Sequence, residues 1–144
     1  ASGVFIGIKS YHQQAHFLRA GLEGVSFVLK SILQVIEQTT GSIRQLNVSG
    51  GFTHSQSWVQ ILADVTGKKV CLIQTEDASA VGAALLSMKA LKVIENFSSL
   101  RSDEGTIISP LKENSAMYEK YFSVFKDLYP ILKDTLHLIA TVEK

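Results

Sequence analysis

The feature that most constrains the fold is a run of helical periodicity over residues 14–38. Within it, apolar side chains recur at steps of three and four residues, which is the spacing of one face of an α-helix. They are Phe17, Leu18, Leu22, Val25, Leu29, Ile32, Leu33 and Ile36. Phe27 and Val28 widen this stripe, so we expect a helix that is buried on more than one side. Gly21 and Gly24 each cost roughly 1 kcal/mol relative to alanine in a helix interior, which favours close packing of another backbone against them.

Short apolar runs alternate with helical patterns over the first 91 residues. The pattern predicts strands at residues 3–8, 46–49 and 70–73, and further helices at residues 57–65 and 78–91. Strands that alternate with helices are typical of an α/β layered domain.

The last third of the chain differs from the rest. Residues 96–110 are polar and rich in turn formers, and we expect them to form an excursion over the surface. A final helix is expected to begin near Asn114 or Ser115, because either residue is a good N-cap. Pro130 is expected to kink or break this helix. An aromatic stripe at helical spacing favours core packing over partner binding. It comprises Tyr118, Tyr121, Phe122, Phe125 and Tyr129.

Composition limits the classes of function. A chain of 144 residues is long enough for one domain with its own core. The net charge of +1 comes from scattered lysines and arginines, which argues against a nucleic-acid partner. No apolar run reaches the roughly 18 residues of a membrane span. Cys71 has no second cysteine to pair with, which favours a reducing cytoplasm. The chain enters its first strand-like run at once and has no initiator methionine, which suggests a piece of a longer protein.

The segment with the clearest chemical meaning is residues 46–58, where a predicted strand runs into Gly50-Gly51 and then into a helix. In an open α/β sheet, ligands bind beyond the carboxyl ends of the strands. Glycine there lets the backbone approach a ligand, and its N–H groups can face phosphate oxygens. We expect these glycines to form a turn that leaves a central strand at the mouth of a cleft. We also expect Gly51 to need either close approach or a positive φ, both of which valine resists.

Other combinations of residues are weaker candidates for a metal site or a catalytic site. His12 and His16 could share a helix face, but no carboxylate or cysteine stands near them in sequence to complete a metal site. Residues 76–77 are two acidic residues that more simply complement a helix N-terminus than act as an acid–base pair. The residue types of a hydrolase triad occur at His54, Ser55 and Asp64, but no nucleophile elbow is visible in the sequence. No complete active site is visible.

Two separated segments together resemble the FGGY carbohydrate kinases. Residues 3–8, followed after seven residues by residues 16–23, are similar to the family's second signature, from which only Gly21 departs. Residues 49–51 and the helix after them are similar to the family's adenosine-binding turn. The matching positions there are Ser55, Trp58, Gln60, Ala63 and Asp64. Further matches are Glu76 and the run Gly82, Ala83 and Ala84.

The resemblance implies a ribonuclease-H-like (actin-like ATPase) α/β domain with a mixed sheet, flanking helices and a long C-terminal helix. Residues 1–144 would be a single C-terminal nucleotide-binding domain, without the N-terminal domain that binds sugar. Gly50 and Gly51 would line the nucleotide and Ser55 would lie near the adenosine. ATP would bring Mg²⁺ with it, with no protein ligand to the metal in this chain. The family's catalytic base lies upstream of residue 3, so no catalytic residue is expected here and the fragment alone would be inactive.

The implied reaction is transfer of the ATP γ-phosphoryl group to a hydroxyl of a sugar or sugar acid. Phe52 after the double glycine resembles gluconate kinases more than xylulose or glycerol kinases, which favours gluconate, with xylulose as the nearest rival. A non-catalytic nucleotide-binding or oligomerisation module is the other reading. The resemblance leaves a homodimer open.

Overall fold

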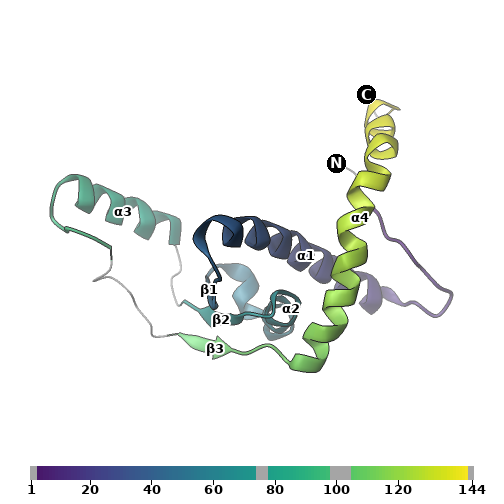
Figure 1. The fold of residues 1–144 in the computed structure, drawn as a ribbon, viewed down its shortest axis with the longest axis horizontal. Helices are drawn as coiled ribbons and strands as arrows, with labels where there is room; N and C mark the ends of the chain where they lie inside the picture. Colours follow the sequence, from purple (N-terminus) through teal and green to yellow (C-terminus); the bar gives the residue numbers. More distant parts are fainter. Residues whose placement is uncertain (1–2, 74–77, 98–104, 143–144) are drawn as a thin grey trace.

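The computed structural model describes residues 3–73, 78–97 and 105–142 (Figure 1). The elements in chain order are α1 (Gln14–Thr40), β1 (Gln45–Val48), the 3₁₀ turn η1 (Gly51–His54), α2 (Gln56–Thr66), β2 (Lys69–Leu72), α3 (Ala78–Ala90), β3 (Thr106–Ile108) and α4 (Lys112–Val142). The predicted α/β class and long C-terminal helix are confirmed. The helices and later strands lie within a few residues of their expected places.

The first predicted strand is wrong for this structure. Residues 3–8 are extended but form no strand with any described residue. Val4, Phe5, Ile6 and Ile8 are each half exposed. A strand exists only where a neighbour takes up its backbone hydrogen bonds. The segment is held instead by an edge-on ring contact between Phe5 and Phe17 of α1, with 5.4 Å between ring centroids.

The sheet is mixed, and its order is β1-β2-β3. β1 pairs parallel with β2, so that Asn47 lies opposite Cys71, and β2 pairs antiparallel with β3. The expected surface excursion over residues 96–110 is wrong in part, because residues 106–108 join the sheet as β3. Gly105 precedes it, and a Cβ built there would lie 2.5 Å from the Leu72 carbonyl oxygen. Close approach of two backbones therefore requires glycine at this entry to β3.

Helix α2 is the centre of the core. One side packs against α1 and α4, in a cluster formed by Phe27, Ile61, Val65, Tyr118 and Phe122. The other side packs on the sheet, in a cluster formed by Val59, Leu62, Ala63 and Val70. Ser55 at the N-cap and Gly67 in the left-handed region at the C-cap delimit the helix.

Helix α4 continues through Pro130, so of the expected kink or break only the break is wrong. Proline removes one backbone hydrogen bond, and both Pro130 and Lys126 one turn earlier are exposed, so water can satisfy the freed carbonyl. The aromatic stripe is core only in part. Tyr118 and Phe122 are 1% exposed, whereas Tyr121 and Tyr129 are about 60% exposed. In Figure 1 the C-terminal half of α4 extends away from the other elements, and α3 lies to one side of them.

Candidate functional site

The turn after β1 begins with a backbone conformation that only glycine adopts readily. Gly50 has φ +101° and ψ 175°, a region that side chains with a Cβ avoid. Its carbonyl oxygen accepts hydrogen bonds from the Thr53 backbone N–H (3.0 Å) and hydroxyl (2.7 Å). Gly51 opens the 3₁₀ turn, and its φ is not positive. The expected positive φ is therefore at Gly50 and not at Gly51.

Both glycines face open space. A Cβ built on either Gly50 or Gly51 would meet no described atom within 4 Å. Neither glycine is thus required by packing inside the described chain. The close approach of a ligand to these glycines remains a prediction, and the space beside them is free of described atoms.

Ser55 has a structural task of its own. Its hydroxyl oxygen accepts a hydrogen bond from the Trp58 backbone N–H at 3.4 Å, and its carbonyl accepts from the Val59 N–H at 3.1 Å. Ser55 is therefore the N-cap of α2. Phe52 and Trp58 brace the turn through an edge-on ring contact at 5.3 Å. The turn, its glycines and Ser55 form one continuous unit at the start of α2.

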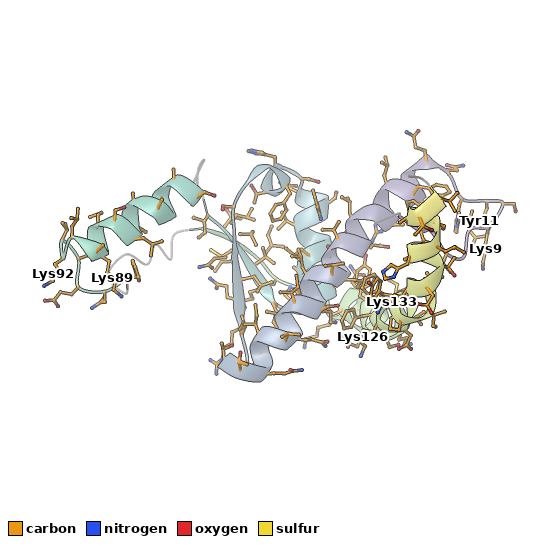
Figure 2. The ribbon with its side chains drawn as sticks, turned by 90° about the horizontal axis from the view of Figure 1, so that it is seen from above. Lys9, Tyr11, Lys89, Lys92, Lys126 and Lys133 are labelled. Atoms are coloured by element: carbon orange, nitrogen blue, oxygen red, sulfur yellow. The ribbon has the colours of Figure 1, made fainter. Side chains whose placement is uncertain are left out.

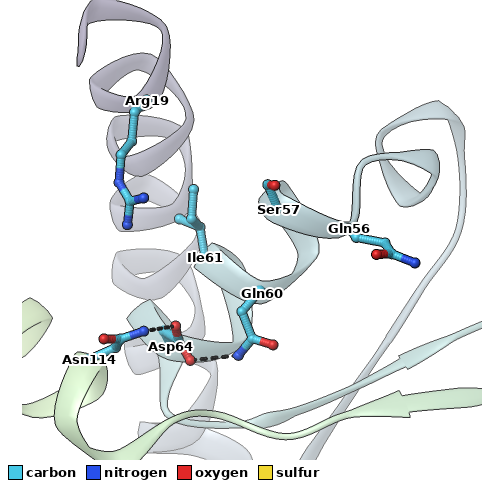
Figure 3. Close-up of a pocket in the computed structure, with 7 residues that line it drawn as sticks. All are labelled: Arg19, Gln56, Ser57, Gln60, Ile61, Asp64 and Asn114. Atoms are coloured by element: carbon cyan, nitrogen blue, oxygen red, sulfur yellow. Dashed lines mark hydrogen bonds between the residues drawn. The ribbon is translucent and has the colours of Figure 1, made fainter. Parts of the chain in front are cut away.

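A polar pocket of about 390 Å³ lies along α2 (Figure 3). It is lined by Arg19, Gln56, Ser57, Gln60, Ile61, Asp64 and Asn114. Asp64 is only 2% exposed. Its carboxylate accepts hydrogen bonds from the Gln60 amide (2.8 Å), the Leu111 backbone N–H (2.8 Å) and the Asn114 amide (2.7 Å). These internal donors indicate that Asp64 ties α2 to the start of α4.

A second polar group joins α1 to α4 beside this pocket. The Tyr118 hydroxyl donates to the Glu23 carboxylate at 2.7 Å and accepts from the Arg19 guanidinium at 2.9 Å. Burial, reinforced by the bond to Glu23, raises the pKa of Tyr118 to about 12. The hydrogen bonds to Glu23 and Tyr118 raise the pKa of Arg19 above its usual value. Tyr118 therefore stays protonated and bridges the two helices over the physiological pH range.

The structure brings some of the residues predicted from the sequence together and places others apart. Gly50, Gly51 and Ser55 come together, but β1 is at an edge of the described sheet and not in its centre. The run from Gly82 to Ala84 is on α3, away from the turn in Figure 1, and Glu76 lies outside the described residues.

The two histidines accept local backbone hydrogen bonds. Each Nδ1 accepts a backbone N–H, for His12 from Lys9 at 3.2 Å and for His16 from Gln13 at 3.0 Å. Over the described ranges, no three His, Cys, Asp or Glu side chains gather to hold a metal.

The hydrogen-bonding roles of the two polar groups around the pocket were not predicted from the sequence. For the first group, Gln60 and Asp64 were noted only as matches to the family's motif and, for Asp64, as a residue type of a hydrolase triad. For the second, no pattern links Arg19 to Tyr118 across 99 positions.

Known proteins resemble this chain over most of its length. Residues 1–91 match the C-terminal domain of the FGGY family of carbohydrate kinases. A xylulose kinase from Staphylococcus epidermidis is 30% identical over 96% of this chain, and a gluconokinase from Bacillus subtilis is 26% identical over 99%. The crystal structure of xylulose kinase from Rhodospirillum rubrum superposes with a TM-score of 0.76 at 27% identity, covering 95% of this chain and 28% of that one.

The chain spans about 28% of the length of the curated relatives it matches. No helix in the described part of the chain has the length and apolar character of a membrane span. The match over 91 of 144 residues, together with the superposed fold, identifies the chain as a member of the FGGY family of carbohydrate kinases.

Proposed function

We propose that this chain supplies the nucleotide-binding side of a carbohydrate kinase that transfers the ATP γ-phosphoryl group to a hydroxyl of a sugar or sugar acid. The observation that carries the proposal is the turn after β1. Gly50 takes a backbone conformation suited to glycine, and open space lies beside both Gly50 and Gly51. The family of the chain and the curated relatives, which are named as sugar kinases, support the same reaction class.

The turn would hold the nucleotide through its backbone. With no side chain at Gly50 or Gly51, a phosphate or ribose oxygen can come within hydrogen-bonding distance of main-chain N–H groups. Ser55 fixes the start of α2 directly after the turn, so its capping bond would keep the turn in place. Mg²⁺ bound with ATP would neutralise charge on the phosphates during transfer. The residues described here would position the nucleotide, and the general base would come from another part of the enzyme.

The proposed sugar is gluconate, with xylulose as the alternative. Phe52 after the double glycine favours gluconate by its resemblance to gluconate kinases. A xylulose kinase shares slightly more identical residues, 30% against 26% for a gluconokinase. An enzyme assay must therefore offer both compounds.

Release of ADP from MgATP tests the proposal. The polypeptide encoded by the complete gene is expected to turn over with gluconate or xylulose, and this 144-residue chain alone is expected to give only background. Turnover by the purified 144-residue chain would place the base inside it. ATP binding without turnover by the complete polypeptide would instead support a non-catalytic nucleotide-binding module.

A further inference from the structure

Thr53 holds the first peptide group of the turn after β1. Its backbone N–H donates to the Gly50 carbonyl oxygen at 3.0 Å, and its hydroxyl donates to the same oxygen at 2.7 Å. No further hydrogen bond from a described residue reaches this carbonyl. The capping bond of Ser55 acts at the later end of the turn. The orientation of the peptide group between Gly50 and Gly51 therefore depends on Thr53.

This orientation leaves the Gly51 N–H free. A trans peptide group places its carbonyl oxygen and its N–H on opposite sides. No described peptide bond is cis, so the Gly51 N–H points away from the side on which the Gly50 carbonyl meets Thr53. Within the described ranges no residue accepts a hydrogen bond from this N–H, and a Cβ built on Gly51 would meet no described atom within 4 Å. The Gly51 N–H is thus a free donor on an exposed residue.

The two glycines make this peptide group easy to turn over. Such a rotation exchanges the positions of the carbonyl and the N–H, and it changes mainly ψ of Gly50 and φ of Gly51. Residues with a Cβ resist many of the resulting conformations, whereas glycine accepts positive and negative φ about equally. The backbone bond from Thr53 opposes the rotation, and the hydroxyl adds a second bond that opposes it.

The turn has no cationic side chain with which to attract a phosphate. Residues 49–58 contain no lysine or arginine. The lysines labelled in Figure 2 lie on other parts of the chain, namely Lys9 before α1, Lys89 and Lys92 at and just after the end of α3, and Lys126 and Lys133 on α4. Recognition of a nucleotide at this turn would therefore depend on main-chain N–H groups, and hydrogen bonds from such groups weaken steeply when the donor is misaligned.

We propose that Thr53 is a positioning residue for the nucleotide. Its hydroxyl holds the Gly50 carbonyl so that the Gly51 N–H is presented to a phosphate or ribose oxygen of the nucleotide. This role rests on the proposed function of the turn, and it adds a side chain that acts through the backbone. The competing explanation is a local structural bond, since threonine hydroxyls often donate to a backbone carbonyl three or four residues earlier. Thr39 does so in α1, where its hydroxyl donates to the Ile36 carbonyl at 2.9 Å.

The test is Thr53→Val in the polypeptide encoded by the complete gene. Valine keeps the branched shape of threonine but has no hydroxyl. Loss of one hydrogen bond predicts a Michaelis constant for ATP that is raised roughly 3- to 10-fold. The dissociation constant for MgATP, measured by calorimetry, should rise by the same factor. The Michaelis constant for the sugar should stay unchanged, and Tm should fall by less than about 2 °C.

Two further variants separate positioning from a local structural role. Thr53→Ser keeps the hydroxyl and should leave both ATP constants within about twofold of those of the unchanged protein. Thr39→Val removes the same kind of bond away from the turn and should change neither constant. A Thr53→Ser variant as impaired as Thr53→Val would assign the effect to side-chain shape and overturn the proposal. So would a Thr53→Val protein that does not fold, or one in which the constants for ATP and sugar rise together as Tm falls.

Gly51→Val distinguishes failure of this role from failure of the proposed turn. If Gly51→Val raises the Michaelis constant for ATP and Thr53→Val does not, the role of Thr53 is overturned and the proposed turn stands. If neither variant raises it, the role of Thr53 and the proposed turn are both overturned.

Discussion

The two sides of α1 have opposite surroundings. On the inner side, Phe27 and Leu33 are 8% and 7% exposed, and Lys30 is buried with its ammonium donating to the Val65 carbonyl at 2.9 Å. The outer side carries Leu18, Val25, Leu29, Ile32 and Ile36, and the side chain of Leu18 is 65% exposed. The sequence has apolar residues on both sides, and the inner side also carries Ser26 and Lys30. The difference shows that periodicity reports which faces are suited to burial, whereas the elements that are present decide which faces are buried.

The inner side is where substitutions should matter most for this chain. We expect Phe122→Ala to lower the free energy of unfolding by about 3–5 kcal/mol, because it empties the cluster between α1, α2 and α4. Tyr121→Ala, one residue earlier and 59% exposed, is the control and should cost less than about 0.5 kcal/mol. Urea denaturation measures both. Equal effects would show that the inner cluster is not the core.

Asp64 should come next. Asp64→Ala leaves the Leu111 N–H and the Asn114 amide without their acceptor and leaves the Gln60 amide only its bond to the Ser109 carbonyl. We expect this to cost about 1–3 kcal/mol. Asp127→Ala is the control, because Asp127 is exposed on α4. The same unfolding measurement applies. An Asp64 variant as stable as the Asp127 variant would mean that the carboxylate does not join α2 to α4.

Much of this architecture could be predicted from sequence. A local pattern of apolar residues marks four elements, namely α1, β1 before Gly50, α2, and β2 around Cys71. β3 could not be predicted, because three residues after a turn carry almost no periodicity. The continuity of α4 through Pro130 depends on exposure, which the sequence does not state. For the candidate site, the Gly50-Gly51 turn was visible as a motif. The positive φ at Gly50 and the pairing of Arg19 with Tyr118 arise only from the backbone path and tertiary contacts.

Tyr118 offers a smaller test of the inner side. Tyr118→Phe removes the hydroxyl between Arg19 and Glu23 and should cost about 1 kcal/mol near neutral pH. The pKa of Tyr118 is raised to about 12 in the folded chain, whereas that of an unfolded tyrosine is about 10. The proton is therefore held more tightly in the folded state, and the stability it provides is complete below about pH 10 and is lost as pH rises toward 12. In Tyr118→Phe this part of the alkaline loss should disappear. An unchanged profile in thermal unfolding against pH would contradict it.

The most direct test of the proposed nucleotide turn is the Michaelis constant (KM) for ATP of the Gly51→Val variant of the polypeptide encoded by the complete gene. Gly51 has no positive φ and open space beside it, so valine should leave Tm nearly unchanged. Gly50→Val is the contrasting variant, because its φ of +101° makes strain and lower stability expected. For Gly51→Val, a misfit of about 1–3 kcal/mol against the nucleotide predicts a KM for ATP raised roughly 5- to 150-fold, with the KM for the sugar unchanged. A stable Gly51→Val enzyme with an unchanged KM for ATP would contradict the assignment of this turn to the nucleotide.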